Sequence, residues 1–305
     1  MGKKKKITFI TFAGSPGETD PKYTEISGAR DRLVAQAVSS GRFSKCLGLD
    51  WPTLQLLCLK WDVEVPVSPH RYTFTPLIAK LISLGAFGDE DFFFYAGAGC
   101  EINLNYFAQH DLRRMTRRAH RNSIYLEHTL LPEKMFTKQE VFDQLHVNAR
   151  DQISPQVMAT FFLVANRFKN GEKFKLFSNW HELSVRNNGQ LISDAYNSAI
   201  HDKSFLAHRN DQSLLSVLTK QLGIKTYMER QRNFVRFFPS LRGSIIFLWT
   251  PRNRSSLSVL PRRASSPWLG FLMSGLSLAS EAIHRIRSIY RLKLNMQSVA
   301  RKTSH

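Results

Sequence analysis

The chain has 305 residues, 43% of them hydrophobic and 22% charged, and its 43 Lys and Arg against 24 Asp and Glu give a formal net charge of +19. An apolar fraction of this size, with 22 Phe, can fill one sizeable core or two small ones, which excludes disorder over most of the length. The 16 Gly and 12 Pro follow no repeat, which excludes fibrous and solenoid proteins.

The chain begins with a basic segment and continues with an apolar one. Lys3 to Lys6 are followed by six apolar or β-branched residues, Ile7 to Phe12. This order imitates a signal peptide, but six residues are fewer than the roughly 7 to 15 that its apolar region needs. The segment therefore predicts a buried first strand over 7–12. Three cysteines without a CxxC spacing argue against a disulfide scaffold, so we expect a reducing, cytoplasmic compartment.

Short apolar runs alternate with helical patterns over the first 100 residues, which is typical of βα units around a parallel sheet. The pattern predicts helices over 30–38 and 77–84 and a short strand over 45–49. The run 91–96 is apolar without alternation, as expected for a central strand that is covered on both faces. These elements together predict an α/β fold.

The central strand ends in a turn of small residues, Gly97 to Gly99. Small residues let the backbone approach a ligand closely, and open α/β sheets bind ligands outside the carboxyl ends of their strands. The acidic triplet Asp89 to Asp91 precedes the strand and is expected at its opposite end, because six extended residues span about 20 Å. We predict that this triplet is a solvated turn.

Three more elements are predicted downstream. The segment Thr137 to Glu140 reads as a capping box that opens a short helix. A buried strand is expected over 157–164 and a helix over 174–183. The polar segment His208 to Ser213 leads into a further helix, whose start would favour an anion. The alternative is that Asn210 or Asp211 caps this helix while its polar neighbours are solvated.

Several of these segments, in this order, resemble a family of nucleotide-sugar glycosyltransferases. The family has an aromatic-x-Asp-Ala-Gly-Cys segment, a Trp-Thr-Lys segment that opens a helix, and a His-Arg-x-Asp-Gln-Ser segment that opens a later helix. The matching parts of this chain are Tyr95 to Asn103, Phe136 to Lys138 with Val141 and Phe142, Gln156, Trp180, and His208 to Ser213. The resemblance covers about residues 6 to 255.

The resemblance implies a GT-A-like, Rossmann-type domain over 1–255, with a mixed, mostly parallel sheet flanked by helices. In such a domain an acidic motif after the central strand holds Mn²⁺ or Mg²⁺ and the diphosphate of the donor. Here Gly97 stands in place of the family's Asp. Three alternatives follow: Glu101 serves a weaker metal site, cations such as Lys80 and Arg209 replace the metal, or the activity is lost.

The resemblance also implies roles for individual residues. Asp211 is the expected general base or acceptor-binding carboxylate, and Glu101 and His208 are the expected metal ligands. Residues expected at the donor or acceptor are Lys80, Gly97, Ala98, Gly99, Asn103, Thr137, Lys138, Gln156, His208, Arg209 and Gln212. The expected partners are a nucleotide-sugar donor and a glycan or glycolipid acceptor.

The last 50 residues, 256–305, form a predicted basic helical tail. From Arg252 to the end, ten Lys and Arg stand against one acid, Glu281. One interpretation is an amphipathic helix that lies on an anionic membrane surface, peripheral to its inner face; the other is a helix that packs back on the domain. Nucleic acid is disfavoured as a partner, because the first 250 residues show no zinc-finger, RNP or helix-turn-helix signature. A non-catalytic relative that acts as a scaffold at a membrane is the alternative function.

Overall fold

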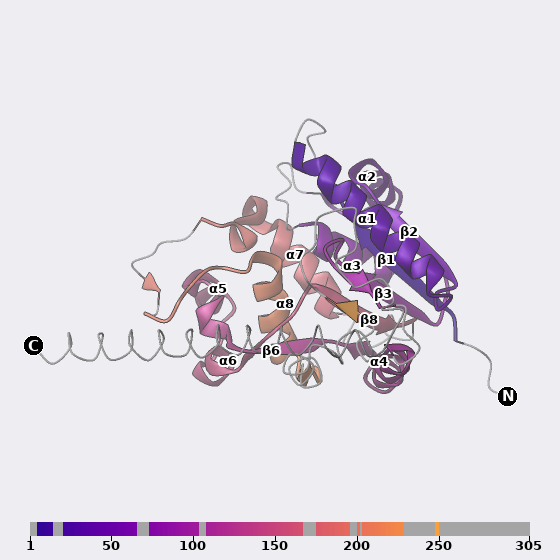
Figure 1. Cartoon of the computed structure of the whole chain (residues 1–305). Coiled ribbons are helices and arrows are strands. Elements are labelled where there is room, and N and C mark those ends of the chain that lie inside the picture. Colours follow the sequence, from indigo (N-terminus) through magenta and orange to yellow (C-terminus); the bar gives the residue numbers. More distant parts are fainter. Residues whose placement is uncertain are drawn as a thin grey trace, which may run out of the picture.

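The computed structural model (Figure 1) describes residues 5–14, 21–65, 73–103, 108–166, 175–195, 200–201, 203–228 and 248–249. The predicted domain boundary at 255 and the predicted tail over 256–305 lie outside these residues. Within the described ranges, no helix is long and apolar enough to cross a membrane.

A five-stranded sheet forms the centre of the molecule, in the order β2-β1-β3-β8-β5. These strands are β1 (Ile7–Phe12), β2 (Lys45–Leu49), β3 (Phe92–Ala96), β5 (Ile124–Tyr125) and β8 (Phe161–Ala165). Strand β1 pairs in parallel with β2 and β3, whereas β8 is antiparallel to both β3 and β5. Because β5 thus runs in the direction of β3, only β8 is reversed, and the expected mixed, mostly parallel sheet is confirmed.

The side chains of β3 alternate between two cores, and all five are buried. Phe92 and Phe94 point to a core that is covered by α1 (Pro21–Ser39) and α4 (Ala108–Asn122). Phe93 and Tyr95 point to a larger core on the opposite face. That face is covered by α2 (Trp51–Lys60), α3 (Phe74–Leu84), α7 (Lys175–Gly189) and α8 (Asn210–Gln221). Burial on both faces explains why this strand carries no charged residue.

Two smaller sheets and several short helices complete the described structure. One sheet has the order β7-β6-β9 and the other pairs β4 with β10. Their strands are β4 (Glu101–Ile102), β6 (Glu127–Pro132), β7 (Pro155–Val157), β9 (Tyr227–Met228) and β10 (Leu248–Trp249). The short helices are η1 (Glu133–Met135), α5 (Gln139–Gln144), α6 (Ala149–Ile153) and η4 (Gln190–Ile192).

The predicted strands over 7–12 and 45–49 are confirmed at both ends. The helices predicted over 30–38 and 77–84 are present but begin earlier, and the one predicted over 174–183 is present as α7 but ends later. The single strand predicted over 157–164 is wrong, since β7 and β8 belong to different sheets. Between them the backbone bonds elsewhere: the Met158 N–H donates to the Glu127 carbonyl at 2.8 Å, and the Thr160 carbonyl accepts from the Gly97 N–H at 2.9 Å. The break therefore places residues 158–160 beside the end of β3.

The predicted capping box is also wrong in its bonds, although a short helix, α5, does begin there, one residue later than the box requires. Lys138 is the N-cap and makes no side-chain capping bond. The Thr137 hydroxyl donates instead to the Glu133 carboxylate at 2.5 Å. A buried carboxylate is a stronger acceptor than its alternatives, so the hydroxyl turns away from the helix end.

Candidate functional site

Three elements meet at the carboxyl end of β3. Tyr95 is the penultimate residue of that strand, and Thr75 and Asp211 lie in the first turns of α3 and α8. The Tyr95 and Thr75 hydroxyl oxygens are 3.3 Å apart, and the Thr75 hydroxyl is hydrogen-bonded to the Asp211 side chain. The Trp180 indole N–H donates to the Asp211 main-chain carbonyl at 2.9 Å. The candidate site thus has a carboxyl group held between two helix starts and the central strand.

The environment of Asp211 changes its acidity. Burial raises the pKa of its carboxyl group to about 7, and hydrogen bonds from the Gln212 and Asp211 N–H groups and the Thr75 hydroxyl oppose that rise. Asp211 as a residue is half-buried. Burial also raises the pKa of Tyr95, so its phenol stays protonated at neutral pH. A carboxyl group that titrates near neutrality can both accept and release a proton.

The turn of small residues after β3 rests on a buried ion pair. An Arg32 guanidinium nitrogen lies 2.8 Å from the Glu101 carboxylate, with 5% and 0% of the two side chains exposed. A second nitrogen of Arg32 donates to the Ala98 carbonyl at 3.2 Å. Arg32 was missed by the sequence reasoning, because nothing near it in the sequence signals a partner 69 positions away.

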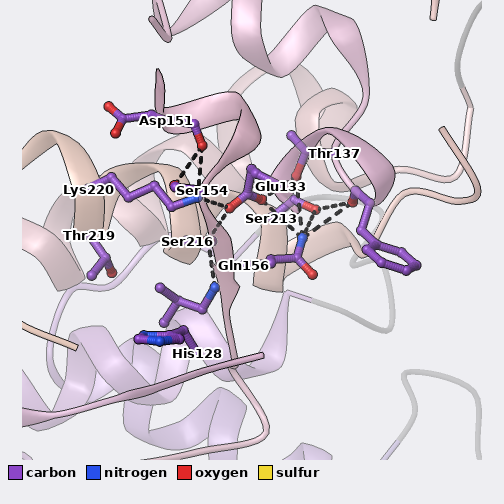
Figure 2. A network of polar contacts seen from close by, with 12 residues as sticks. His128, Glu133, Thr137, Asp151, Ser154, Gln156, Ser213, Ser216, Thr219 and Lys220 are labelled. Carbon is purple, nitrogen blue, oxygen red and sulfur yellow. Dashed lines mark hydrogen bonds and ion pairs between the residues drawn. The ribbon is translucent and has the colours of Figure 1, made fainter. Parts of the chain in front are cut away.

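Glu133 is the centre of a second polar group (Figure 2), and its side chain is fully buried. One carboxylate oxygen accepts from the Thr137 hydroxyl at 2.5 Å and from the Gln156 amide at 3.0 Å. The other accepts from the Lys220 ammonium at 2.5 Å and from the Ser216 hydroxyl. We call these five residues the Glu133 network. Thr137 and Gln156, expected at the substrate, are thus buried partners of a carboxylate that the sequence reasoning missed.

The Glu133 network extends to the start of α8. The Gln156 side-chain oxygen accepts from the Gln212 amide at 2.8 Å and from the Arg209 guanidinium at 3.3 Å. The Arg209 guanidinium also lies over the Phe136 ring, 3.8 Å from its centre. Gln156 therefore holds Arg209 and Gln212, two half-buried residues on either side of Asp211 in the sequence. These bonds fix the turn that carries the Asp211 carboxyl group.

The predicted solvation of His208 is wrong, because the side chain is buried and both ring nitrogens are engaged. One accepts from the Lys138 N–H at 3.3 Å and the other lies 2.8 Å from the Leu191 carbonyl. Burial lowers the pKa of His208 to about 3, so the ring is neutral. The ammonium group of Lys138 donates to the main-chain carbonyls of Gln190, Ser193 and Ala195. His208 and Lys138 thus hold the segment 190–195.

Asn210 does not cap α8. Its backbone is in the left-handed region at φ 49°, and the N-cap residue, Arg209, makes no side-chain capping bond. The Asn210 side chain instead donates to the Ile192 carbonyl at 2.7 Å and to the Asp194 carboxylate at 2.8 Å. Together with His208, it ties the start of α8 to η4.

The remaining predicted residues lie at the edges of this arrangement. Lys80 faces α7, where its ammonium group donates to the Ser178 hydroxyl at 3.1 Å. Asn103 is buried directly after β4, and Gly99 is half-buried in the turn. The turn and the start of α8 are joined by residues 158–160, since the Ala159 N–H donates to the Gln212 side chain at 3.5 Å. The triplet Asp89 to Asp91 lies before β3, as predicted, and Asp91 is exposed.

A cavity of about 280 Å³ opens beside α5. Its walls combine three apolar side chains with polar ones: Lys134, Thr137, Gln139, Phe142, Gln152, Ile200, His201 and Phe205. Thr137, a predicted substrate residue, therefore lies at the wall of this cavity. Asp211 does not line this cavity.

A divalent metal does not fit the described side chains. Among the residues that the structure describes, no three His, Cys, Asp or Glu side chains converge where an ion could be held. Glu101 is paired with Arg32 and the His208 ring is engaged at both nitrogens, so a metal on either would have to displace an existing bond. Gly97 offers no side chain.

Comparison with known proteins gives distant structural similarity. No protein-family model matches the chain, and no curated protein sequence matches it. Mouse xyloside xylosyltransferase 1 in its apo form is 10% identical, with 83% of this chain and 100% of that chain covered and a TM-score of 0.42. A glycosyltransferase involved in glycosylating the major capsid of PBCV-1 is 8% identical, covering 89% and 99%, with a TM-score of 0.40.

The glycosyltransferase GlyE of Streptococcus pneumoniae TIGR4 is 13% identical, with 92% of this chain and 64% of that chain covered and a TM-score of 0.36. These structural neighbours are glycosyltransferases. At such identities and scores the likeness carries no argument about activity, which therefore depends on the site itself.

Proposed function

We propose that the chain is a glycosyltransferase that moves a sugar from a nucleotide-sugar donor to a glycan or glycolipid acceptor. The observation that carries the proposal is the Asp211 carboxyl group, whose pKa is raised to about 7 by burial at the carboxyl end of β3. Ligands of open α/β sheets bind at this end of the strands. The motif resemblance assigns the same residue to the acceptor.

In this reaction Asp211 acts as the general base. Its carboxylate accepts the proton of the acceptor hydroxyl as the hydroxyl oxygen forms a bond to the anomeric carbon of the donor sugar. The bond from that carbon to the diphosphate oxygen breaks, and the nucleoside diphosphate leaves with the electron pair. The proton on Asp211 then passes to water. Proton transfer to a general base contributes about 10²–10⁴-fold to the rate of a reaction when the pKa of the base lies near the working pH.

The leaving diphosphate needs positive charge to stabilise it. The first turns of α3 and α8 both lie at this site, and free N–H groups and the helix dipole favour an anion there. Arg209 is half-buried and is the cation nearest to Asp211 along the chain. Lys80 follows Thr75 on the same helix, α3, a little more than one turn later. We propose that these groups bind the diphosphate and that the turn of Gly97 to Gly99 lets its backbone approach.

Thermal unfolding with donor nucleotides tests the proposed function. UDP-, GDP- and CMP-sugars are added singly, each with and without Mn²⁺, and the melting temperature is measured. A ligand at about 100 times its Kd stabilises the folded state by roughly 2.7 kcal/mol. A shift with one nucleotide class supports the proposal, and radiolabelled sugar transfer with that donor follows. No shift with any nucleotide favours the scaffold function.

The Gly97→Asp variant tests the metal. Its fold should be retained, because a Cβ at position 97 meets only the Thr160 carbonyl oxygen, at an ordinary 3.5 Å, and the backbone is outside the left-handed region. The new carboxylate should raise the affinity for UDP about tenfold or more in Mn²⁺ over the affinity without it, as measured by calorimetric titration. Unchanged, metal-independent binding by the folded variant would show that this turn handles no metal.

The Thr75→Val variant tests what sets the acidity of Asp211. The Thr75 hydroxyl lowers the pKa of Asp211, so its removal should raise that pKa further. A hydrogen bond to a charged group is worth about 1.5 kcal/mol or more, so the acidic limb of the pH–rate profile should move upward by about one pH unit. Thr75→Ser keeps the hydroxyl and should leave the profile in place. Carbon-13 NMR titration of the Asp211 carboxyl group measures the same shift without a substrate.

A further inference from the structure

Helix α4 carries an unusual concentration of positive charge. Over the whole helix, Ala108–Asn122, five arginines stand against one acid, Asp111. Arg113, Arg117 and Arg121 are spaced by four residues, which places them on one line along the helix. All three are exposed, whereas residues on the opposite side of the helix are packed against the sheet: Leu112, Met115 and Ala119. The row therefore points away from the core.

The charge of this row is not neutralised by described neighbours. The carboxylate of Asp111 is paired with Arg114 at 2.5 Å, and Arg118 lies over the Tyr227 ring, 4.2 Å from its centre. Within the described residues, no ion pair includes Arg113, Arg117 or Arg121. The guanidinium groups of Arg113, Arg117 and Arg121 are thus exposed, on a helix whose opposite side packs against the sheet.

Two lysines extend the positive surface beyond the helix. The Lys5 ammonium lies 5.2 Å from the centre of the Phe92 ring, and the His120 ring lies 6.5 Å from the same ring. On the other side, the Lys225 ammonium lies 5.9 Å from the Tyr227 ring that Arg118 covers. We call the combined surface the α4 basic face; it consists of Lys5, Arg113, Arg117, Arg118, Arg121 and Lys225.

We propose that the α4 basic face binds the headgroups of an anionic lipid membrane. A straight row of exposed arginines about 12 Å long, flanked by lysines, complements a plane of negative phosphate and carboxylate groups. Sites for single-stranded nucleic acid add exposed rings on which bases stack. Here the ring within the face, Tyr227, is covered by Arg118. None of the residues of the α4 basic face belongs to the candidate site or to the predicted tail.

Vesicle co-sedimentation of the full chain tests the proposal. Binding to phosphatidylcholine vesicles that contain phosphatidylserine is compared between the wild type and the triple variant Arg113→Gln/Arg117→Gln/Arg121→Gln. We expect the partition coefficient of the variant to fall about tenfold or more, and the wild type not to bind pure phosphatidylcholine. Unaltered melting of the triple variant shows that the fold is kept.

The matched control removes the same charge elsewhere. Lys60, Lys175 and Lys203 are exposed, and the triple variant Lys60→Gln/Lys175→Gln/Lys203→Gln should keep its vesicle binding within about twofold. Equal loss in both variants would show that only net charge matters, and full binding by the arginine variant would place the membrane contact elsewhere. A stronger affinity for a duplex or single-stranded oligonucleotide, lost in the arginine variant, would assign the face to nucleic acid instead. Each of these outcomes overturns the proposal.

Discussion

Asp211→Asn is expected to lower the rate of sugar transfer by about 10²–10⁴-fold while the chain still folds and binds its donor nucleotide. Asparagine has the shape of aspartate but cannot accept the acceptor's proton. The Thr75 and Trp180 contacts leave room for it, since Trp180 bonds to the main chain of residue 211. Steady-state kinetics measure the loss of transfer rate, and a nucleotide-binding titration measures whether the affinity for the donor is kept. A variant with full activity would remove Asp211 from the mechanism.

The same variant has a second expected result, in its stability. The folded-state pKa of Asp211 is about 7, well above the ordinary 3.8. Between about pH 4 and 7 the folded state therefore holds a proton that the unfolded state releases, so the contribution of Asp211 to stability falls as pH rises. Asparagine has no proton to lose, and the variant should melt above the wild type at pH 8 and approach it toward pH 4. If the variant is inactive but more stable than the wild type at alkaline pH, the Asp211 carboxyl group serves activity and lowers the stability of the fold.

His208 does not obscure this comparison. Its folded-state pKa of about 3 lies below the ordinary 6.5, so its contribution is present above pH 6.5 and lost as the pH falls. This dependence is opposite in sign to that of Asp211, but it is the same in the wild type and the variant. The difference in melting temperature between the two proteins therefore reports Asp211.

Glu133→Gln is expected to destabilise the fold by about 3 kcal/mol or more. The Glu133 side chain is fully buried and its two oxygens accept from four side chains, including that of Lys220, which is 11% exposed. The amide keeps the shape but leaves that ammonium without its counter-charge, and its NH₂ group meets other donors. Urea denaturation measures the loss in unfolding free energy.

A matched control is available on the surface. Glu182 pairs with Arg186 at 2.6 Å, but 63% and 51% of these side chains are exposed. Glu182→Gln should cost only about 0.5 kcal/mol or less. The double variant Glu133→Gln/Lys220→Met should be more stable than the sum of its single changes, because it removes the unpaired charge. Equal losses from Glu133→Gln and Glu182→Gln would contradict the role given to the Glu133 network.

The fold was predictable where hydrophobic periodicity is strong. Strands β1 and β2 and the buried run of β3 follow from apolar patterns alone. Helix α4 was not predicted, because its many arginines hide the apolar positions that face the sheet. The break between β7 and β8 could not be seen either, because Met158 to Thr160 include neither glycine nor proline and leave the sheet for bonds to distant segments.

The site was predictable in its members but not in their roles. The resemblance selected Thr137, Gln156, Arg209 and Gln212, and the structure brings all four into one set of hydrogen bonds. Gln156 joins them, and Gln156 is itself held by the carboxylate of Glu133, which lies in no motif. Because its partners are up to 87 residues away, only the tertiary structure reveals that several of these side chains hold the turn of Asp211 in place.

The sequence distances within the Glu133 network bear on how the chain is made. Thr137 and Gln156 lie 4 and 23 residues from Glu133, whereas Ser216 and Lys220 lie 83 and 87 residues away. During synthesis the carboxylate therefore emerges long before its cation. Until α8 leaves the ribosome and docks, burial of Glu133 is opposed by its charge, and closing so long a loop is slow. We therefore expect docking of α8 to allow η1 and β7 to pack, and nascent chains that end before Lys220 should remain open to proteases around Glu133.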